Sequence, residues 1–230
     1  MTSWRGLGEA VKAHPDGRST ASRLVATAER VGYDGVVLRN AHRLPDSPSI
    51  VDIRDAEGID VVHGVELSDG IDAVSGRLPH LRRQTSILMV AGGTEERNRF
   101  VAAQEHVDVL TSPIGPDGPD IDPGVATDAQ AHGVAIEIDL GPLRARGGQR
   151  VRYIDRLRRL WRVIDHEDLP YVVTATPSTH LELVAPRELA ALADPVGIDA
   201  DAARDGLAAW LDIAARNRER FGEGFLDGAD

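Results

Sequence analysis

Polar side chains that could bind a metal or exchange protons follow most of the strands that the sequence predicts. They are histidines, carboxylates, an arginine and an asparagine: His14, Asp16, Arg39, Asn40, His42, Glu66, Glu137, Asp139 and His180. In a parallel barrel the loops after the strands gather at one end, so these side chains would form a ring there. A hydrolytic metal site in such a ring needs about three histidine or carboxylate ligands per ion and an open position for water.

The ring does not have the spacing that a metal site needs. Lys12 and Asp16 stand two residues on either side of His14, so no His-x-His pair follows the first strand. The predicted fourth and fifth strands end in Ala-Gly-Gly and Thr-Ser-Pro, which hold no histidine or carboxylate. No serine stands in a nucleophile-elbow context either. We therefore expect no catalytic residue, metal or cofactor held by this chain, and we describe the ring as degenerate: His14, Asp16, Glu66, Glu137, Asp139 and His180.

The strongest local charge signal lies between residues 144 and 162. This segment has a net charge of +7 from one aspartate and eight arginines: Arg144, Arg146, Arg150, Arg152, Arg156, Arg158, Arg159 and Arg162. Arg152, Arg156 and Arg159 follow i, i+4, i+7 spacing and would share one face of a helix. Guanidinium groups fork onto phosphates and stack on bases, so the segment predicts contact with RNA or an acidic partner. A solvated helix face, or pairing with acids elsewhere in the chain, is the alternative.

The elements that must position these residues alternate between strands and helices. Seven β-rich runs are predicted: 10–14, 34–39, 59–67, 86–91, 107–111, 134–138 and 171–175. Helical patterns fill the gaps at 19–31, 94–104, 122–131, 149–167, 186–192 and 201–220, with Ser19 expected to cap the first. Apolar strands between helices predict an α/β fold. We expect one barrel of the triosephosphate-isomerase type over residues 1–230, with a C-terminal helix and acidic tail over 199–230.

An open doubly wound sheet is the alternative fold. The first strand–helix turn reads His-Pro-Asp-Gly-Arg-Ser and lacks the GxGxxG pattern, so a dinucleotide-binding fold has little support.

Composition indicates the salt concentration and the cellular compartment to which the protein is adapted. The 230-residue chain has a net charge of −11, with 24 aspartates, 25 arginines and Lys12 as its only lysine. Such a balance is typical of proteins adapted to molar salt, where the Debye length is about 3 Å and net charge hardly limits the choice of partner. A GC-rich genome would also favour arginine. Cysteine is absent, and no apolar run approaches the roughly 20 residues of a membrane span; we expect a cytoplasmic protein.

Several motifs along the chain resemble one family. The resemblance spans roughly residues 9 to 197, and its motifs follow in order: 13–17 (AHPDG), 32–40 (GYDGVVLRN), 64–67 (GVEL), 91–99 (AGGTEERNR), 107–113 (VDVLTSP), 136–140 (IEIDL) and 185–192 (APRELAAL). On these motifs the chain resembles the archaeal RNase P protein component 3 family, the relatives of the eukaryotic thirty-kilodalton RNase P subunit.

The resemblance implies a barrel related to the PHP phosphoesterases, with their metal constellation degenerate. It also implies a subunit of ribonuclease P, which removes 5′ leaders from precursor tRNA with catalysis by the RNA and its Mg²⁺ ions. The expected partners are that RNA, a small ferredoxin-like protein subunit in a heterotetramer, and precursor tRNA indirectly. We expect RNA or subunit contacts from Arg39, Asn40, Arg144, Arg146, Arg150, Arg152, Arg156 and Arg159.

Other interpretations stay open at this point. The main rival is a free-standing PHP-type phosphoesterase that uses His14, Glu66, Asp139 and His180. A third interpretation is a barrel that binds only a protein partner. Arg39 also has an internal alternative, which is pairing with Glu66 or Glu137 at the barrel mouth.

Overall fold

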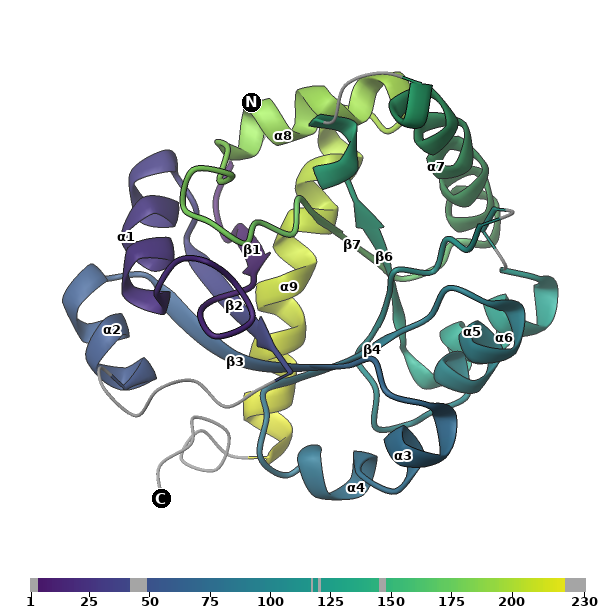
Figure 1. The fold of residues 1–230 in the computed structure, drawn as a ribbon, viewed down its shortest axis with the longest axis horizontal. Helices are drawn as coiled ribbons and strands as arrows, with labels where there is room; N and C mark the ends of the chain where they lie inside the picture. Colours follow the sequence, from purple (N-terminus) through teal and green to yellow (C-terminus); the bar gives the residue numbers. More distant parts are fainter. Residues whose placement is uncertain (1–3, 42–48, 117, 120, 145–147, 222–230) are drawn as a thin grey trace.

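Seven parallel strands, hydrogen-bonded in sequence order, form the centre of the computed structural model (Figure 1). The structure describes residues 4–41, 49–116, 118–119, 121–144 and 148–221. The strands are β1 (Gly8–Val11), β2 (Gly35–Asn40), β3 (Asp60–Leu67), β4 (Ile87–Ala91), β5 (Val109–Thr111), β6 (Ala135–Asp139) and β7 (Tyr171–Thr174). They curl into a nearly closed barrel in which each strand pairs with its neighbours in sequence.

Helices surround the strands in Figure 1, whereas the last helix crosses the middle of the ring. The surrounding helices are α1 (Ala21–Val31), α2 (Ile50–Glu57), α3 (Ile71–Ser75), α4 (Leu78–Leu81), α5 (Glu95–Ala102), α6 (Pro123–His132), α7 (Gly148–Glu167) and α8 (Pro186–Ala193). Two 3-10 turns, η1 (Gly141–Arg144) and η2 (Asp194–Val196), precede α7 and the last helix, α9 (Ala200–Phe221). None of the helices in the described ranges is long and apolar enough to cross a bilayer.

The interior of the barrel is filled from its amino end by α9. Every strand contributes inward side chains to one apolar cluster, which also contains Trp210, Ile213 and Ala214 of α9. The Trp210 indole donates a hydrogen bond of 2.9 Å to the carbonyl of Val173. A Cβ at Gly35, the first residue of β2, would come within 2.7 Å of the Leu211 side chain, so the helix can approach closely only because that residue is glycine.

Polar contacts fix the same helix to the strand starts. The Asn217 amide donates hydrogen bonds of 2.8 Å to the carbonyl of Ser86 and to the Asp108 carboxylate. Arg218 forms a forked pair with Asp60 at 2.6 and 2.9 Å. Because Asp60, Ser86 and Asp108 precede or begin β3, β4 and β5, α9 closes the amino end and leaves the carboxyl end for function.

The sequence predicted this barrel and its seven strands correctly, but some boundaries were wrong. The first strand is Gly8–Val11 rather than 10–14, because Lys12 N–H donates to Pro177 O and the chain leaves the ladder there. Thr20, not Ser19, caps α1. The short helices α2, α3 and α4 were not predicted. The expected C-terminal helix is α9, which closes the barrel, and the tail beyond 221 lies outside the described residues.

A side chain bridges the seam between β1 and β7, which no strand ladder joins in the described part of the chain. The Glu9 carboxylate accepts hydrogen bonds from the Thr174 hydroxyl, from Ala175 N–H at 3.1 Å and from the Tyr33 hydroxyl at 3.1 Å. Burial raises the pKa of Glu9 to about 7, although these three hydrogen bonds act to lower it. A single carboxyl group thus replaces part of the missing ladder.

We expect Trp210→Ala to lower the free energy of unfolding by about 3–5 kcal/mol, because it empties the centre of the α9 seal. Trp210→Phe should lose less, since it keeps most of the ring and removes the hydrogen bond to Val173. Urea unfolding in molar KCl measures both, with the exposed Asp212→Ala on the same helix as control. Equal stability of Trp210→Ala and the control would contradict the assigned role of α9.

Glu9→Gln is expected to flatten the dependence of stability on pH. The carboxyl group has an ordinary pKa of 4.5 when unfolded and a pKa of about 7 when folded, so unfolding releases a proton between these values. Stability therefore falls as the pH rises through this window. The glutamine variant should exceed the wild type at pH 8 by roughly 3 kcal/mol and approach it near pH 4.5. Urea unfolding at several pH values decides the point, and identical slopes for the two proteins would refute it.

Candidate functional site

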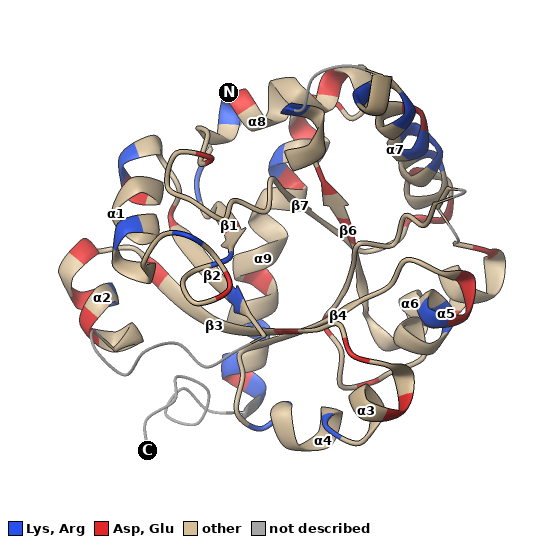
Figure 2. Cartoon of the chain, viewed as in Figure 1, with Lys and Arg blue, Asp and Glu red and all other residues tan. Residues whose placement is uncertain are grey.

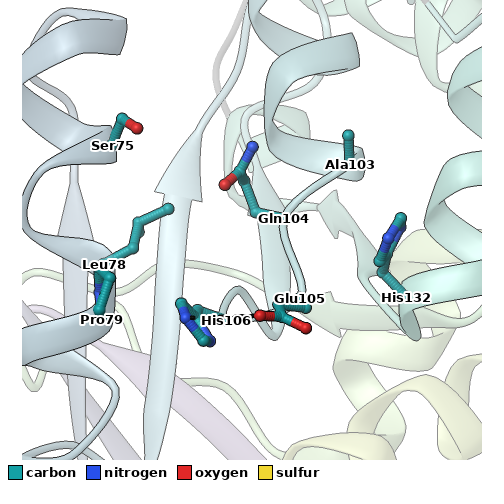
Figure 3. A pocket seen from close by; sticks show the side chains of 8 residues that line it. All are labelled: Ser75, Leu78, Pro79, Ala103, Gln104, Glu105, His106 and His132. Atoms are coloured by element: carbon teal, nitrogen blue, oxygen red, sulfur yellow. Dashed lines mark ion pairs between the residues drawn. The ribbon is translucent and has the colours of Figure 1, made fainter.

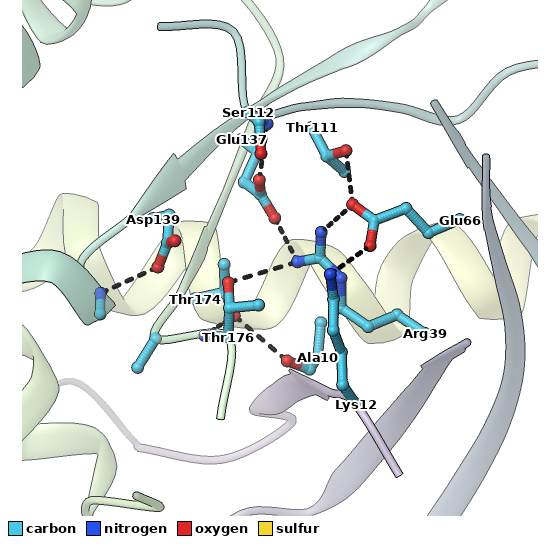
Figure 4. A network of polar contacts seen from close by, with 12 residues as sticks. Ala10, Lys12, Arg39, Glu66, Thr111, Ser112, Glu137, Asp139, Thr174 and Thr176 are labelled. Carbon is cyan, nitrogen blue, oxygen red and sulfur yellow. Dashed lines mark hydrogen bonds and ion pairs between the residues drawn. The ribbon is translucent and has the colours of Figure 1, made fainter. Parts of the chain in front are cut away.

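The carboxyl end of the barrel interior is lined by polar residues (Figure 4). Side chains alternate between the two faces of a strand, so the residue two positions beyond an inward apolar residue also points inward. Val37, Val109, Ala135 and Val172 belong to the inner apolar cluster. Two positions further along β2, β5, β6 and β7 stand Arg39, Thr111, Glu137 and Thr174.

Arg39 lies at the centre of this polar layer. One terminal amino group donates to the Glu66 carboxylate at 2.5 Å and the other to the Glu137 carboxylate. The same Glu66 oxygen accepts from the Thr111 hydroxyl at 2.8 Å, and its other oxygen pairs with the Lys12 ammonium at 2.9 Å. Arg39 is only 1% exposed, so its charge is compensated inside the protein rather than by water.

The carboxylates and cations of the layer stabilise one another's charged forms. Burial disfavours the charge on Glu66, but the attraction of Arg39 and then Lys12 prevails and lowers its pKa to about 2. Burial likewise opposes the charge on Arg39, yet the fields of Glu137 and Glu66 raise the pKa of its guanidinium. Arg39 and Glu66 are therefore both ionised throughout the physiological range.

Asp139 lies beside this network and has a different electrostatic environment. Burial, followed by the charge of Glu137, raises the pKa of Asp139 to about 7, although hydrogen bonds such as that from Gly141 N–H act to lower it.

Glu137 also accepts a hydrogen bond of 2.9 Å from the N–H of Ser112, whose φ of 48° is unusual for a residue other than glycine. The carboxylate layer thus also holds the backbone at the end of β5 in a sparsely populated conformation.

The described side chains of this layer are not arranged as ligands of a divalent metal ion. Glu66 and Glu137 converge on a single point, but the guanidinium of Arg39 already occupies it. Among the described residues no group of three histidine, aspartate or glutamate side chains is arranged to hold a metal. The four residues of the phosphoesterase alternative, His14, Glu66, Asp139 and His180, are not brought together as ligands.

The other members of the predicted ring have structural contacts. Asp16 accepts a hydrogen bond from Ala41 N–H at 2.6 Å, and His180 Nδ1 lies 3.0 Å from the Ser19 hydroxyl. The buried Asn40 amide donates to Ala13 O at 2.5 Å and accepts from Ala13 N–H at 3.1 Å. His14 is exposed, and His42 lies outside the described residues.

Arg39 forms the internal ion pair that the sequence left as an alternative, with both glutamates at once. Because Arg39 and Asn40 already have buried partners within the chain, the structure gives both a role in holding the barrel together. Their contact with RNA or another subunit stays a prediction.

Two hollows in the described surface have the size of a small-molecule site. One, of about 320 Å³, lies above the Arg39 network and is lined by Lys12, Asp16, Arg39, Ala41, Glu66, Ser68, Ala91 and Ser112. The other, of about 400 Å³, lies away from the network and is lined by Ser75, Leu78, Pro79, Ala103, Gln104, Glu105, His106 and His132 (Figure 3). Its one ion pair, between His106 and Glu105 at 3.8 Å, lies at its exposed rim, and its other polar groups do not converge on a reacting position.

The arginines of α7 provide the clearest exposed chemistry. Arg156 and Arg158 lie on the two flanks of the exposed face of α7. Arg156 donates a hydrogen bond to the carbonyl of Pro116, and Arg158 donates one of 2.9 Å to the carbonyl of Pro195. Between these flanks Arg152, Arg159 and Arg162 are exposed, and we call these three residues the α7 ridge. Arg152 and Arg162 make no hydrogen bond or ion pair with any other described residue, and Arg159 bonds only to the Asp155 carbonyl of its own helix. Among the described residues, therefore, the ridge arginines have no acidic partner elsewhere in the chain.

The remaining predicted arginines differ in their surroundings. Arg144 donates to the carbonyl of Glu182, whereas Arg150 is exposed at the start of α7. Arg146 lies outside the described residues. Arg156, expected on one face with Arg152 and Arg159, is half-buried against Pro116 and does not belong to the ridge.

Sequence analysis missed four residues that complete the polar layer and the seam: Glu9, Lys12, Thr111 and Thr174. A signal existed for two of them. Thr111 and Thr174 follow an inward valine by two positions in runs that are otherwise apolar. Glu9 had no such signal, because its importance depends on the gap between β1 and β7.

Comparison with known proteins gives consistent matches. The family model described as RNase P subunit p30 matches residues 10–221. A protein of Halorubrum lacusprofundi called ribonuclease P protein component 3 is 46% identical over 228 residues, covering 95% of this chain and 94% of that protein. The protein of that name from Haloarcula marismortui is 44% identical over 214 residues, covering 92% and 91%. Both sources are halophilic archaea, which supports the prediction of a high-salt protein.

A solved structure shows the same fold. A chain in the cryo-EM structure of archaeal ribonuclease P with mature tRNA superposes with a TM-score of 0.76 at 16% identity, covering 97% of this chain and 96% of that one. The predicted barrel is therefore confirmed, and the open doubly wound sheet is excluded.

We expect Arg39→Met to lower the free energy of unfolding by about 3–5 kcal/mol, because it leaves two buried carboxylates without their shared cation. The combined replacement of Arg39→Met, Glu66→Gln and Glu137→Gln should regain at least half of that loss, since no buried charge is then left uncompensated. Chemical unfolding at pH 7 in molar KCl compares the two. A combined variant no more stable than Arg39→Met would show that the carboxylates are not the cause.

Proposed function

Since the chain belongs to the RNase P subunit p30 family, we propose that it acts as a protein subunit of a cytoplasmic ribonuclease P and contacts RNA through the α7 ridge. The observation that carries the contact surface is the α7 ridge, three exposed arginines that pair with no acidic side chain in the described part of the chain. In this proposal the RNA and its Mg²⁺ ions remove the 5′ leader of precursor tRNA. The chain supports the RNA together with a small ferredoxin-like subunit.

The ridge suits RNA in both length and chemistry. Arg152 and Arg162 are ten residues apart, which corresponds to about 15 Å along a helix. Planar guanidinium groups can fork onto phosphates or stack on exposed bases over that distance. Figure 2 shows closely spaced basic positions along α7, which also carries a few acidic ones.

High salt favours this mode of contact over a broad positive field. At molar salt, charges more than about 3 Å apart are screened, so only groups that touch the RNA contribute. Short-range forks and stacking persist under these conditions, which suits arginine better than lysine. The net charge of −11 therefore does not prevent RNA binding.

The barrel mouth supports a scaffold rather than a second catalytic centre. Its two converging glutamates form ion pairs with Arg39 and Lys12, so neither carboxylate is available as a general base or a metal ligand. We propose that the polar layer keeps the barrel rigid, so that α7 has a fixed orientation toward the RNA.

Reconstitution tests the function itself. Ribonuclease P RNA and the other protein subunits of a halophilic archaeon are combined with or without this chain in molar KCl and Mg²⁺. Removal of the 5′ leader from precursor tRNA is then measured. The chain should raise the rate or lower the Mg²⁺ requirement, and an unchanged reaction would contradict the proposal.

Replacement of Arg152, Arg159 and Arg162 by alanine is expected to weaken RNA binding about 10-fold and to reduce the salt slope of binding by about 2–3. The matched control replaces Arg23, Arg30 and Arg83, which are exposed on other elements and have no side-chain partner among the described residues. Both triple variants lose the same charge. Equal weakening by the two would show that net charge, and not the ridge, determines binding.

A further inference from the structure

Two loops at the carboxyl end of the barrel are joined into one rigid unit. The loop after β1, residues 12–18, lies against the loop after β7, residues 176–185, which we call the Leu181 loop. Lys12 N–H donates to Pro177 O at 2.9 Å, and Arg18 N–H donates to Ser178 O at 2.7 Å. A Cβ at Gly17 would fall 1.8 Å from Lys12 O and 2.9 Å from Ser178 O, so only glycine allows the loops this close.

Glu182 fixes the Leu181 loop from inside. Its carboxylate accepts hydrogen bonds from Ser178 N–H at 2.7 Å and from Thr179 N–H at 3.1 Å. It also pairs with Arg18 at 2.9 Å. On the other side the Arg144 guanidinium donates to the Glu182 carbonyl. Hydrogen bonds within the chain thus hold the loop on both sides of Leu181.

This well-fixed loop presents an apolar side chain to solvent. Leu181 is 78% exposed, more than Val151 at 60% or Val51 at 43%, the other large hydrophobic side chains exposed in the described residues. A single exposed leucine on a loose loop would mean little. Here the backbone on both sides is already ordered, so a partner could bury Leu181 with little further loss of conformational entropy.

We propose that Leu181, with Arg18 and Arg144 beside it, docks into an apolar pocket rimmed by carboxylates on another protein. Leucine offers neither hydrogen bonds nor a ring for stacking on bases, so the surface fits a protein better than RNA. The two exposed arginines, each with donors left over after its bond to Glu182, match an acidic rim. The inference rests on the proposed function, because the partner would be another protein of the same ribonucleoprotein.

The test uses the full chain and the purified ribonuclease P protein subunits of a halophilic archaeon, mixed without RNA in molar KCl. Calorimetry or size-exclusion chromatography measures the affinity of the chain for the other protein subunits. Leu181→Ser should weaken this affinity about 10-fold or more, as expected for a central apolar anchor. Val51→Ser, the same kind of change at an exposed apolar residue of α2, should leave the affinity within twofold. Glu182→Ala keeps Leu181 but releases the loop, and it should also weaken the association.

RNA binding by the same variants separates the two classes of partner. The RNA affinity of Leu181→Ser should stay within twofold of that of the wild type. Its thermal unfolding should match that of Val51→Ser. If the wild-type chain supports cleavage but Leu181→Ser associates with the protein subunits as tightly as the control, the docking proposal alone is overturned. A loss of RNA affinity in place of protein affinity overturns it as well. A wild-type chain that leaves cleavage unchanged contradicts the proposed function, and one that binds none of the protein subunits overturns the docking proposal.

Discussion

The burial of Arg39 between Glu66 and Glu137 determines what the carboxyl end of this barrel can do. Three charged side chains from different strands are removed from water together, which is tolerable only because each compensates another. The arrangement ties β2 to β3 and β6 across the barrel. It also places a permanent cation where two carboxylates converge, so the position that could hold a catalytic metal is filled by the chain itself.

The two ends of the barrel are closed by different forces. At the amino end α9 supplies Trp210 and its apolar neighbours to the barrel interior, and glycines at the strand starts let the helix come close. At the carboxyl end the closure is polar and depends on ion pairs and on hydrogen bonds across the seam. A barrel fixed at both ends has little freedom to open, which agrees with a role in positioning external surfaces rather than in binding a substrate inside.

Those external surfaces divide by chemistry. The α7 ridge carries arginines that pair with no acid among the described residues, whereas the Leu181 loop carries an apolar tip on a backbone held by hydrogen bonds to Glu182. For the contacts proposed at both surfaces, strong screening at molar salt favours direct contact over long-range attraction. A net charge of −11 is therefore compatible with RNA binding, because it is an average over surfaces of different kinds.

The sequence by itself determined the alternation of strands and helices, the single barrel, the family and the position of the arginine-rich helix. These follow from local signals: apolar runs, helical periodicity, caps and motifs in order. Only the tertiary structure decided that Arg39 pairs with both glutamates, that Glu9 bridges the seam and that Arg156 turns away from the ridge. The short helices α2 to α4 also escaped prediction, since one or two turns give too little periodicity to recognise. The physical reason is that ion pairing and burial depend on residues far apart in the chain, such as Glu9 and Thr174, whose distance only the closed barrel sets.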